Sequence, residues 1–378
     1  MFTEERPPTR IAMDVTALLG STTGVGQMVK QLASRLPRYP SVELTGLIVS
    51  WRGRSRLGHV IPPGWHMKPL PLPARLTHAG WRRFDRPRLN GFDLVHGPNY
   101  IVPPTDGAAR LVTVHDLTAW RFPELVDSHS QYYPKHLLRA VAEGADIHAV
   151  SSFVADEIEA ELGVDRDRIH VIRNGYEPIA AGDADRGRSL VGAPYVLAIG
   201  TIEPRKDFVT LVRAMAAIWP IFPDIKLVIA GANGWGTEEL DEVIEELGVA
   251  DRIKRLGYVS DPVKADLLVG SELLAYPSVY EGFGLPLLEA MGAGVPVVST
   301  SAGAIPEIAG RAAVLVEPRD PSALAGALLS VLEDDGLRRQ PAEAGRQQVI
   351  GYSWDQATEE MISTYHRLSG GRVELADR

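Results

Sequence analysis

The feature that most constrains the fold of this 378-residue chain is a repeated alternation of short β-branched runs with amphipathic helical patterns. The runs form two series of expected strands, which begin at Arg10, Val42, Asp93, Arg110, Asp146 and Arg168, and then at Tyr195, Ile225, Arg252, Glu272, Pro296 and Ala312. Helical patterns lie between them, among others over residues 26–36, 153–162, 208–219, 237–247 and 321–332. Almost continuously apolar strands that alternate with helices predict parallel sheets covered on both faces.

The boundary between the two series divides the chain into two expected domains. Residues 180–194, AAGDADRGRSLVGAP, are small, polar and charged without a periodic pattern, which favours a linker. We therefore predict an α/β protein with two doubly wound, Rossmann-like domains that face each other across a cleft. The N-terminal domain would span residues 1–183, the C-terminal domain residues 190–352, and a last helix residues 353–369. Such sheets bind ligands beyond the carboxyl ends of their strands.

Composition excludes several classes of function. The formal net charge of −9 makes the whole molecule an unsuitable nucleic-acid binder, and the absence of cysteine excludes disulfides and cysteine metal sites. The N-terminal sequence MFTEERPPTR lacks the apolar stretch of a secretory signal, and no apolar run has the length of a membrane span. These features predict a cytoplasmic protein.

One segment departs from this acidic composition. Residues 51–90 carry nine Lys and Arg side chains against one acid, Asp85, with three tryptophans and one phenylalanine interleaved. One interpretation is a surface that approaches an anionic acceptor or the inner face of a membrane. The other is a proline-rich solvated loop whose arginines pair with acids elsewhere, and the sequence leaves both open.

The stretch from Tyr280 to Thr300, YEGFGLPLLEAMGAGVPVVST, holds two carboxylates among apolar, Gly and Pro residues. It predicts a glycine turn followed by a helix with proline in its first turn, and this helix is apolar on every side. Glu289 in the helix needs hydrogen-bond donors, because an unpaired buried carboxylate is costly. A ribose diol would supply two donors, and an internal arginine is the alternative. Glu281 would stand at the mouth of the same site, where Gly282 and Gly284 let a ligand approach the backbone.

A second candidate site lies in GTIEPRKDFVTLVRAM, which begins at Gly200. Asp207 is expected to cap a helix that starts at Phe208. Arg205 and Lys206 precede this helix, where the positive end of the helix dipole disfavours cations. An anion such as a diphosphate between the two side chains would explain their position, and projection into solvent is the alternative.

Two weaker signals lie in the N-terminal half. In STTGVGQ, Gly24, Val25 and Gly26 open a helix, which suits backbone contacts with phosphate but also an ordinary tight turn. In TVHDL, His115 and Asp116 end a strand, and the carboxylate of Asp116 would orient the imidazole of His115. No pair of His or acidic residues has a spacing that indicates a metal site.

Together these motifs resemble those of the retaining glycosyltransferases of family GT4, which have the two-domain GT-B fold. EGFGLPLLEAMGAGVPVV resembles the family's E-x7-E signature, GTIEPRKD its phosphate-binding loop, TVHDL its His-Asp motif on the acceptor side, and TTGVGQ its N-terminal glycine loop. YSWDQATEEMISTYHRL resembles the C-terminal helix that crosses back to the first domain in this fold. The resemblance covers nearly the whole chain. One departure is Thr201, where many members have an arginine directly after the glycine that ends the strand.

The resemblance implies a role for each candidate residue. Glu289 would bind the ribose, and Arg205 and Lys206 would neutralise the diphosphate. Glu281 would hold hydroxyls of the donor sugar, and His115 would lie beside that sugar. The implied catalytic residues are His115, Glu281, Arg205 and Lys206. The implied donor-binding residues are Gly24, Val25, Gly26, Arg205, Lys206, Glu281, Gly282, Phe283, Gly284, Leu285 and Glu289.

The function implied by the resemblance is that of a retaining hexosyltransferase in cell-envelope polysaccharide synthesis. It would move mannose from GDP-mannose, without a metal cofactor, to a hydroxyl of a glycan or lipid-linked acceptor, with residues 51–90 as a contact to the membrane surface and no nucleic acid as partner. A UDP-sugar donor, such as UDP-glucose or UDP-GlcNAc, is the alternative within the family. A nicotinamide-dependent oxidoreductase and a non-catalytic sugar-nucleotide-binding protein are the alternatives from other classes. The oxidoreductase needs a glycine turn directly after the first strand, which the sequence does not offer cleanly.

Overall fold

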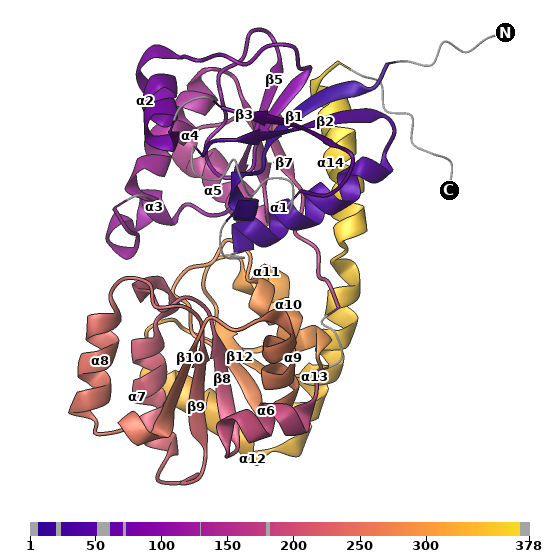
Figure 1. Ribbon diagram of the computed structural model, residues 1–378. Helices are drawn as coiled ribbons and strands as arrows, with labels where there is room; N and C mark the ends of the chain where they lie inside the picture. The colour runs from indigo at the N-terminus through magenta and orange to yellow at the C-terminus, as the bar shows by residue number, and fades with distance from the viewer. Residues whose placement is uncertain are drawn as a thin grey trace, which may run out of the picture. The chain divides into compact units, whose positions relative to one another are not determined.

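The computed structural model describes residues 7–19, 24–50, 61–70, 73–128, 130–178 and 182–370, without the side chain of Asp335. Within these ranges the chain forms two compact units (Figure 1). The first unit takes its residues from 1–120, 128–175 and 354–378, and the second from 121–127 and 176–353. The chain therefore enters the second unit twice and returns to the first unit for its last helix.

A parallel sheet of seven strands forms the centre of the first unit, in the order β3-β2-β1-β4-β5-β6-β7. Its strands are β1 (Thr9–Asp14), β2 (Val42–Ile48), β3 (Trp65–Pro69), β4 (Leu94–Gly97), β5 (Ala109–Val114), β6 (Asp146–Ala149) and β7 (Ile169–Val171). Its helices are α1 (Gly24–Arg35), α2 (Ala74–Phe84), α4 (Tyr133–Ala142), α5 (Ser152–Leu162) and α14 (Trp354–Leu368). The short helix α3 (Thr118–Arg121) lies at the point where the chain first passes to the second unit.

A parallel sheet of six strands forms the centre of the second unit, in the order β10-β9-β8-β11-β12-β13. Its strands are β8 (Tyr195–Ile199), β9 (Lys226–Ala230), β10 (Ile253–Gly257), β11 (Leu273–Tyr276), β12 (Val297–Thr300) and β13 (Val314–Val316). Its helices are α6 (Ala184–Val191), α7 (Phe208–Ile218), α8 (Thr237–Glu246), α9 (Asp261–Gly270), α10 (Leu285–Gly292), α11 (Ile305–Ala309), α12 (Pro321–Glu333) and α13 (Asp335–Gln348). Each strand that the sequence predicts is present, and the prediction of two parallel, doubly wound sheets is confirmed.

Alternate strand residues of the second sheet pack against different helices. Val196 and Ala198 of β8 belong to one core cluster with residues of α7, α8 and α12. On β8, Tyr195 and Leu197 are also fully buried but stand outside this cluster, as expected for a strand covered on both faces. The order of strands reverses between β8 and β11, where Leu273 pairs with Val196. The carboxyl ends of β8 and β11 therefore flank the switch point of the sheet, the usual place for a ligand.

Two predictions about irregular segments are wrong. The described part of the basic segment is not a loop, because it contains β3 and α2, and α2 buries Trp81, whose Nε1 donates to the carbonyl of Pro87 at 3.0 Å. Residues 184–191, inside the expected linker, form α6, which packs against α9. The carboxylate of Asp183 caps α6 by accepting from two backbone N–H groups. Both helices contain at least two arginines and bury few residues, which are Thr77 and Trp81 on α2 and Gly187 on α6. Contacts at these few positions, rather than a wide buried apolar stripe, hold the helices in place.

Parts of several predicted segments lie outside the described residues. These are residues 51–60 and 71–72 of the basic segment, residues 22 and 23 of the glycine loop, and residues 180 and 181 of the expected linker.

A buried chain of hydrogen bonds joins α14 to the first sheet. The hydroxyl of Tyr365 lies 2.7 Å from Nδ1 of His96, and Nε2 of His96 lies 2.8 Å from Oγ1 of Thr113. Thr113 continues the chain to Nδ1 of His148 at 2.9 Å, and Nε2 of His148 ends it on the carbonyl of Ile172 at 2.9 Å. Burial lowers the pKa of His96 and brings that of His148 to about 4, so both rings are neutral at pH 7. Because a carbonyl oxygen only accepts, Nε2 of neutral His148 carries the hydrogen, and this fixes every donor back to the tyrosine hydroxyl.

Replacing Tyr365 with Phe is expected to lower the free energy of unfolding by about 1–3 kcal/mol, because Nδ1 of His96 would remain buried without its donor. Urea unfolding of the full chain at pH 7 measures the change. Tyr258→Phe, which removes the hydroxyl of an exposed tyrosine, is the matched control and should unfold like the wild type. Equal unfolding midpoints for Tyr365→Phe and the wild type would show that the chain of bonds does not stabilise the docked helix.

Candidate active site

The two C-terminal motifs of the sequence lie at the switch point of the second sheet. The turn after β8 contains the 3-10 helix Pro204–Lys206, and the turn after β11 carries Glu281. The two turns are joined by a hydrogen bond from the N–H of Val279 to the carbonyl of Arg205 at 2.9 Å. Asp207 caps α7 as predicted, by accepting from the N–H of Thr210 at 3.2 Å.

A buried ion cluster fills the space between these turns. The carboxylate of Glu281, 6% exposed, accepts hydrogen bonds from the ammonium group of Lys206 and, at 2.8 Å each, from the hydroxyls of Tyr276 and Ser278. Its second oxygen, Oε2, lies 2.8 Å from Nη1 of Arg205. We call Glu281, Arg205 and Lys206, with the hydroxyls of Tyr276 and Ser278, the glutamate cluster.

Electrostatics keep this glutamate ionised. Burial raises the pKa of Glu281, but the charges of Arg205 and Lys206 outweigh it and lower the pKa to about 2. Burial lowers the pKa of Lys206, whose ammonium group also lies 4.8 Å from the centre of the Tyr276 ring. At neutral pH we therefore assign a full negative charge to the glutamate and positive charges to both partners.

The structure corrects two sequence-based interpretations of this cluster. Glu281 does not stand at the mouth of a site with its carboxylate free, because it is buried against both cations. Arg205 and Lys206 do not depend on an external anion for their position, because Glu281 is their counterion and Glu203 is a second one, 2.7 Å from Nη2 of Arg205. Two carboxylates thus balance two cations within the protein.

Glu289 also has a partner within the protein. Its Oε1 accepts a hydrogen bond at 2.6 Å from Nζ of Lys264 on α9, and Lys264 lies 3.5 Å from Asp261. The expectation that Glu289 depends on a ligand for a hydrogen-bond donor is therefore wrong, and the internal cation is a lysine rather than an arginine. The role of Glu289 in binding ribose stays a prediction. Burial raises the pKa of Glu289, and Lys264 opposes that rise.

The helix that carries Glu289 is not apolar on every side in the structure. Its buried residues are Leu287, Leu288, Ala290 and Met291. Leu285 and Glu289, four residues apart, are half-buried and share one face, and the side chain of Glu289 is 19% exposed. This face leaves room for a ligand beside the Glu289–Lys264 pair. We find no hydrogen-bond partner for Oε2 of Glu289 among the described residues.

The backbone conformation of the turn before this helix explains why it contains glycine. Gly284, at the N-cap of α10, has a φ of 104°, which L-residues with a side chain rarely adopt. Phe283 is buried, with its ring centre 5.9 Å from that of Tyr352. Gly282 is buried as well, so the turn from Gly282 to Leu285 is packed into the second unit.

The candidate residues of the N-terminal half belong to the first unit. Nε2 of His115, directly after β5, lies 2.8 Å from the carbonyl of Pro98, so Nε2 carries the hydrogen and Nδ1 has the lone pair. The expectation that Asp116 orients this ring is wrong, because Oδ1 of Asp116 accepts from the N–H of Thr118 at 2.9 Å and from the hydroxyl of Tyr100 at 3.1 Å. Burial lowers the pKa of His115, which is therefore neutral at pH 7.

The glycine loop has its described residues inside a helix. Gly24, Val25 and Gly26 form the first turn of α1, and Gly24 is exposed with open space beside its α-carbon. A first turn offers backbone N–H groups that the helix itself does not use. The position agrees with the predicted start of a helix, and the phosphate role remains a prediction.

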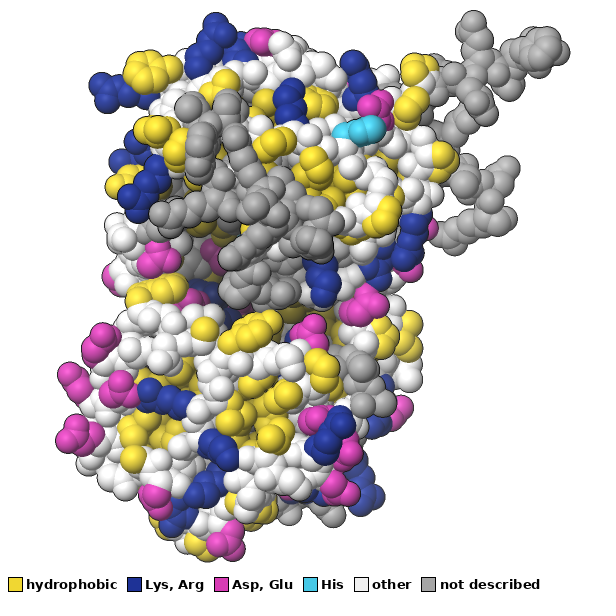
Figure 2. All heavy atoms as spheres, viewed as in Figure 1, with side chains coloured by type: hydrophobic (Ala, Val, Ile, Leu, Met, Phe, Trp, Pro, Cys, Tyr) yellow, Lys and Arg dark blue, Asp and Glu magenta, His cyan; other side chains and the backbone are white. Residues whose placement is uncertain are grey.

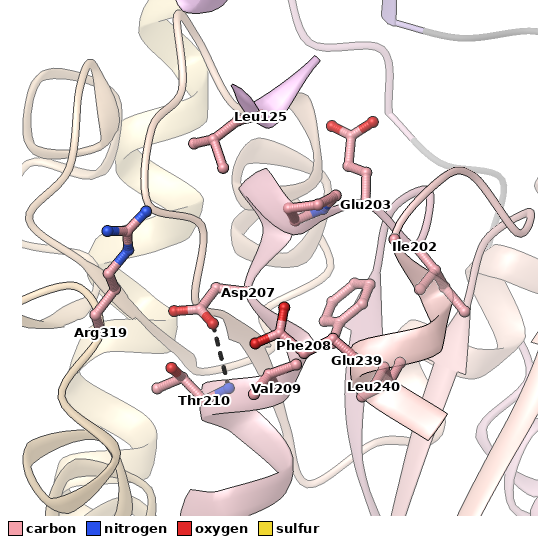
Figure 3. A pocket seen from close by; sticks show the side chains of 12 residues that line it. Leu125, Ile202, Glu203, Asp207, Phe208, Val209, Thr210, Glu239, Leu240 and Arg319 are labelled. Atoms are coloured by element: carbon pink, nitrogen blue, oxygen red, sulfur yellow. Dashed lines mark hydrogen bonds between the residues drawn. The ribbon is translucent and has the colours of Figure 1, made fainter. Parts of the chain in front are cut away.

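A cavity of about 280 Å³ lies next to the Arg205–Lys206 turn, within the second unit (Figure 3). Its charged lining residues are Glu203, Asp207, Glu239 and Arg319. Oδ2 of Asp207 is buried and lacks a hydrogen-bond partner among the residues described, and burial raises the pKa of this group. Three carboxylates against one guanidinium do not suit a diphosphate, so we place no part of a nucleotide sugar there.

Sequence reasoning missed four residues that complete the site. They are Glu203, Lys264, Tyr276 and Ser278. Tyr276 and Ser278 could have been found from the sequence, because they lie at the end of the strand that precedes Glu281. Lys264 could not, because it lies on another helix, 25 residues before Glu289.

The described residues include neither a candidate metal site nor a candidate membrane span. No group of three or more His, Asp and Glu side chains is placed to hold a metal ion. No helix combines the length and the apolarity needed to cross a membrane.

The sequence matches two models of protein families. Residues 22–178 match the model described as Glycosyltransferase Family 4, and residues 184–348 match the model described as Glycosyl transferases group 1. Together the two matches span the sequence from the glycine loop to the end of α13.

Curated relatives and solved structures agree with these matches. The chain is 32% identical over 285 residues to the O-antigen chain mannosyltransferase B of Escherichia coli, covering 73% of this chain and 74% of the relative. It is 30% identical over 332 residues to the D-inositol 3-phosphate glycosyltransferase of Salinispora arenicola, covering 78% and 73%. The structure of HepE from Anabaena in complex with UDP-glucose is similar in fold, with a TM-score of 0.73, 19% identity, and coverage of 94% of this chain and 99% of HepE.

Replacing Glu281 with Gln is expected to lower the free energy of unfolding at pH 7 by about 3 kcal/mol, because two buried cations would lose their main counterion. Since the pKa of Glu281 lies below the ordinary 4.5, its contribution is present above pH 4.5 and is lost as the pH falls toward 2. The difference between variant and wild type should therefore shrink over that interval. Chemical unfolding at a series of pH values measures it.

The exposed Glu245 of α8 offers the matched control, and Glu245→Gln should unfold like the wild type at each pH. A Glu281→Gln variant as stable as the wild type at pH 7 would show that the cluster contributes nothing to the fold.

Proposed function

The chain belongs to glycosyltransferase family 4, and from that premise we propose that it transfers mannose from GDP-mannose, with retention, to a hydroxyl of a glycan or lipid-linked acceptor. The family identifies the chain as a glycosyltransferase with the GT-B fold, acting on a nucleotide-sugar donor. Mannose is supported by the E. coli relative, whose name states that it is an O-antigen chain mannosyltransferase. That relative also favours a role in cell-envelope polysaccharide synthesis.

The observation that carries the proposal is the glutamate cluster at the switch point of the second sheet. Breaking the bond between the sugar and the diphosphate leaves negative charge on the leaving group. Arg205, which is half-buried, and Lys206, which is buried, are positive and held by Glu281 before any ligand arrives, so they can stabilise that charge without rearranging in the reaction. The proposal assigns this task to the two side chains and not to a metal cofactor.

Donor binding is proposed to exchange partners within the cluster. The diphosphate would accept hydrogen bonds from Arg205 and Lys206, and hydroxyls of the sugar would donate to Glu281 in their place. Such an exchange keeps the carboxylate supplied with donors, which a buried anion requires. The backbone of the turn at Phe283 and Gly284 would add N–H donors, as the resemblance to the family implies.

The ribose is assigned to Glu289 on its half-buried face. Lys264 occupies Oε1, and the ribose diol would donate to the other oxygen and relieve the carboxylate of part of its burial cost. The Lys264 pair keeps Glu289 in place when no nucleotide is present.

His115 is assigned to the acceptor side. Its neutral ring has a lone pair on Nδ1, which accepts a hydrogen bond from a hydroxyl group. Retention would follow if the leaving phosphate oxygen itself takes the proton of the attacking acceptor hydroxyl, as the resemblance implies.

A UDP-sugar donor is the second candidate. It is favoured by HepE, which was solved with UDP-glucose, but at 19% identity that likeness concerns the fold alone.

We predict that GDP-mannose raises the melting temperature of the protein more than UDP-glucose, UDP-GlcNAc or ADP-glucose does, and that the protein slowly releases GDP from GDP-mannose. Arg205→Ala and Lys206→Ala should each slow this release by about 100-fold, because each removes a donor to the leaving group. Thermal shift and a coupled GDP assay measure both effects, and EDTA should leave the rate unchanged.

Arg213→Ala is the matched control, because this arginine of α7 is exposed and pairs only with Glu246 among the described residues. A larger rise in melting temperature with UDP-glucose than with GDP-mannose would contradict GDP-mannose as the donor and indicate UDP-glucose instead. Tight donor binding without any release of nucleotide would identify a binding protein instead of an enzyme.

The described part of the basic segment supports a contact with the membrane surface. On α2, Arg75, Arg82 and Arg83 are exposed together with Leu76 (59%) and Phe84 (68%). Figure 2 shows dark blue and yellow side chains side by side over the part of the first unit where Figure 1 places α2. A helix that presents arginines next to large apolar side chains fits an anionic lipid surface.

Tyr132, which ends the 3-10 helix Ser130–Tyr132 directly before α4, extends this surface. Tyr132 is exposed, and on α4 Lys135 and Leu138 are exposed as well. The guanidinium of Arg82 lies 5.7 Å from the centre of the Tyr132 ring, which places the two groups on one patch. We propose that this patch holds the enzyme against anionic lipid, where a lipid-linked acceptor would be reached.

Replacing Arg82 and Arg83 together with Gln is expected to reduce binding to vesicles with 30% phosphatidylglycerol by roughly 30-fold, since each basic residue near such a surface contributes about 1 kcal/mol. Sedimentation with these vesicles and with neutral ones measures the loss. The double variant Arg166→Gln/Arg213→Gln removes the same charge elsewhere and should bind like the wild type. Equal sedimentation of all three proteins with the anionic vesicles would show that this patch does not bind the lipid surface.

A further inference from the structure

The second unit contains another cavity, at the edge of its sheet opposite to the glutamate cluster. Its volume is about 520 Å³. Glu272 and Pro296, which line it, directly precede β11 and β12, whereas Glu281 follows the carboxyl end of β11. Nucleotides of open α/β sheets bind at the carboxyl ends of the strands. This cavity is therefore separate from the site proposed for the donor.

The cavity is positively charged in an acidic protein. Its charged lining residues are Arg188 of α6, Glu272, and Arg338, Arg339, Glu343 and Arg346 of α13. Four guanidinium groups against two carboxylates leave a formal charge of +2, while the whole chain has a net charge of −9. The remaining lining consists of small or apolar residues such as Val269, Ala293 and Val295.

The arginines of this cavity differ in the number and burial of their partners within the protein. Arg338 is committed, because it pairs with Glu272 at 3.2 Å and donates to the carbonyl of Leu332 at 2.8 Å, at the end of α12. Arg346 is 54% exposed, and its ion-pair partner in the described part of the chain is the exposed Glu343 at 3.2 Å, a type of pair that contributes little. Arg188 is exposed, and we find no hydrogen-bond or ion-pair partner for its guanidinium within the described ranges.

A glycine shapes the wall next to Arg346. Gly294 follows α10 with a φ of 70°, and a Cβ at this position would overlap the guanidinium of Arg346. The missing side chain thus leaves room for the guanidinium next to the backbone at the cavity wall. The planar fork of a guanidinium favours two-point recognition of phosphate oxygens.

We propose that the arginine cavity binds a small ligand with a phosphate monoester, whose two negative charges match the charge of the lining. Arg188 from α6 and Arg346 from α13 would contact the phosphate, with Arg338 and Glu272 fixing the wall behind it. The volume suits a phosphorylated sugar or a compound of similar size, since small-ligand sites commonly measure about 300–1,000 Å³. Inorganic phosphate and a sugar phosphate share this chemistry, and the size of the cavity favours the sugar phosphate.

Isothermal titration calorimetry of the full chain with ribose 5-phosphate tests the proposal. The wild type should bind one equivalent, and the double variant Arg188→Ala/Arg346→Ala should bind at least tenfold more weakly. Gly294→Ala should also weaken binding, because its methyl group displaces the guanidinium without removing a charge. Inorganic phosphate should bind more weakly than ribose 5-phosphate, and ribose should not bind.

Two controls separate this cavity from the donor site and from unspecific attraction of anions. Arg205→Ala should bind ribose 5-phosphate like the wild type, and so should Arg166→Ala/Arg213→Ala, which loses two exposed arginines elsewhere. Melting temperatures show that each variant is folded. Unchanged binding in Arg188→Ala/Arg346→Ala, loss of binding in Arg205→Ala, or the absence of binding to the wild type at millimolar ribose 5-phosphate would overturn the assignment.

Discussion

The second unit depends on one buried ion cluster, in which Glu281 is bound by Arg205 and Lys206. The three residues come from the turns after β8 and β11, so the cluster joins the two strand ends at the point where the sheet reverses its order. An uncompensated charge at this depth would be costly, and mutual neutralisation removes most of that cost. The same pairing explains how two cations can precede a helix, where its dipole disfavours them.

The fold was largely predictable because parallel strands buried on both faces form recognisable apolar runs. The prediction missed β3, α2 and α6. On α2, Arg75 and Arg82 face solvent, and one large side chain, Trp81, holds the helix to the core. With three arginines among its eleven residues and prolines on both sides, α2 has a low overall hydrophobicity, which favoured the loop interpretation.

The candidate site was predictable in its residues and not in its pairings. One functional region was predicted from the spacing of Glu281 and Glu289 and from the position of Arg205 and Lys206. In that prediction each charged group was paired with a ligand rather than with another residue of the protein. Lys264 lies on another helix, and its pairing with Glu289 follows from the packing of α9 and α10. Contacts between residues far apart in the sequence cannot be predicted from a local motif. A charged residue in a buried motif therefore indicates that it has a partner, but the motif does not show which residue the partner is.

The protonation states of the candidate residues suit the donor proposed for this chain. With a pKa of about 2, Glu281 of the second unit only accepts hydrogen bonds at neutral pH. In the first unit, Nδ1 of the neutral His115 ring also only accepts. Sugar hydroxyls are donors that such groups require. Arg205 and Lys206 only donate, and diphosphate oxygens only accept. Under the proposed exchange of partners, a ligand without hydroxyls would leave Glu281 short of donors, and a ligand without phosphates would leave Arg205 and Lys206 short of acceptors.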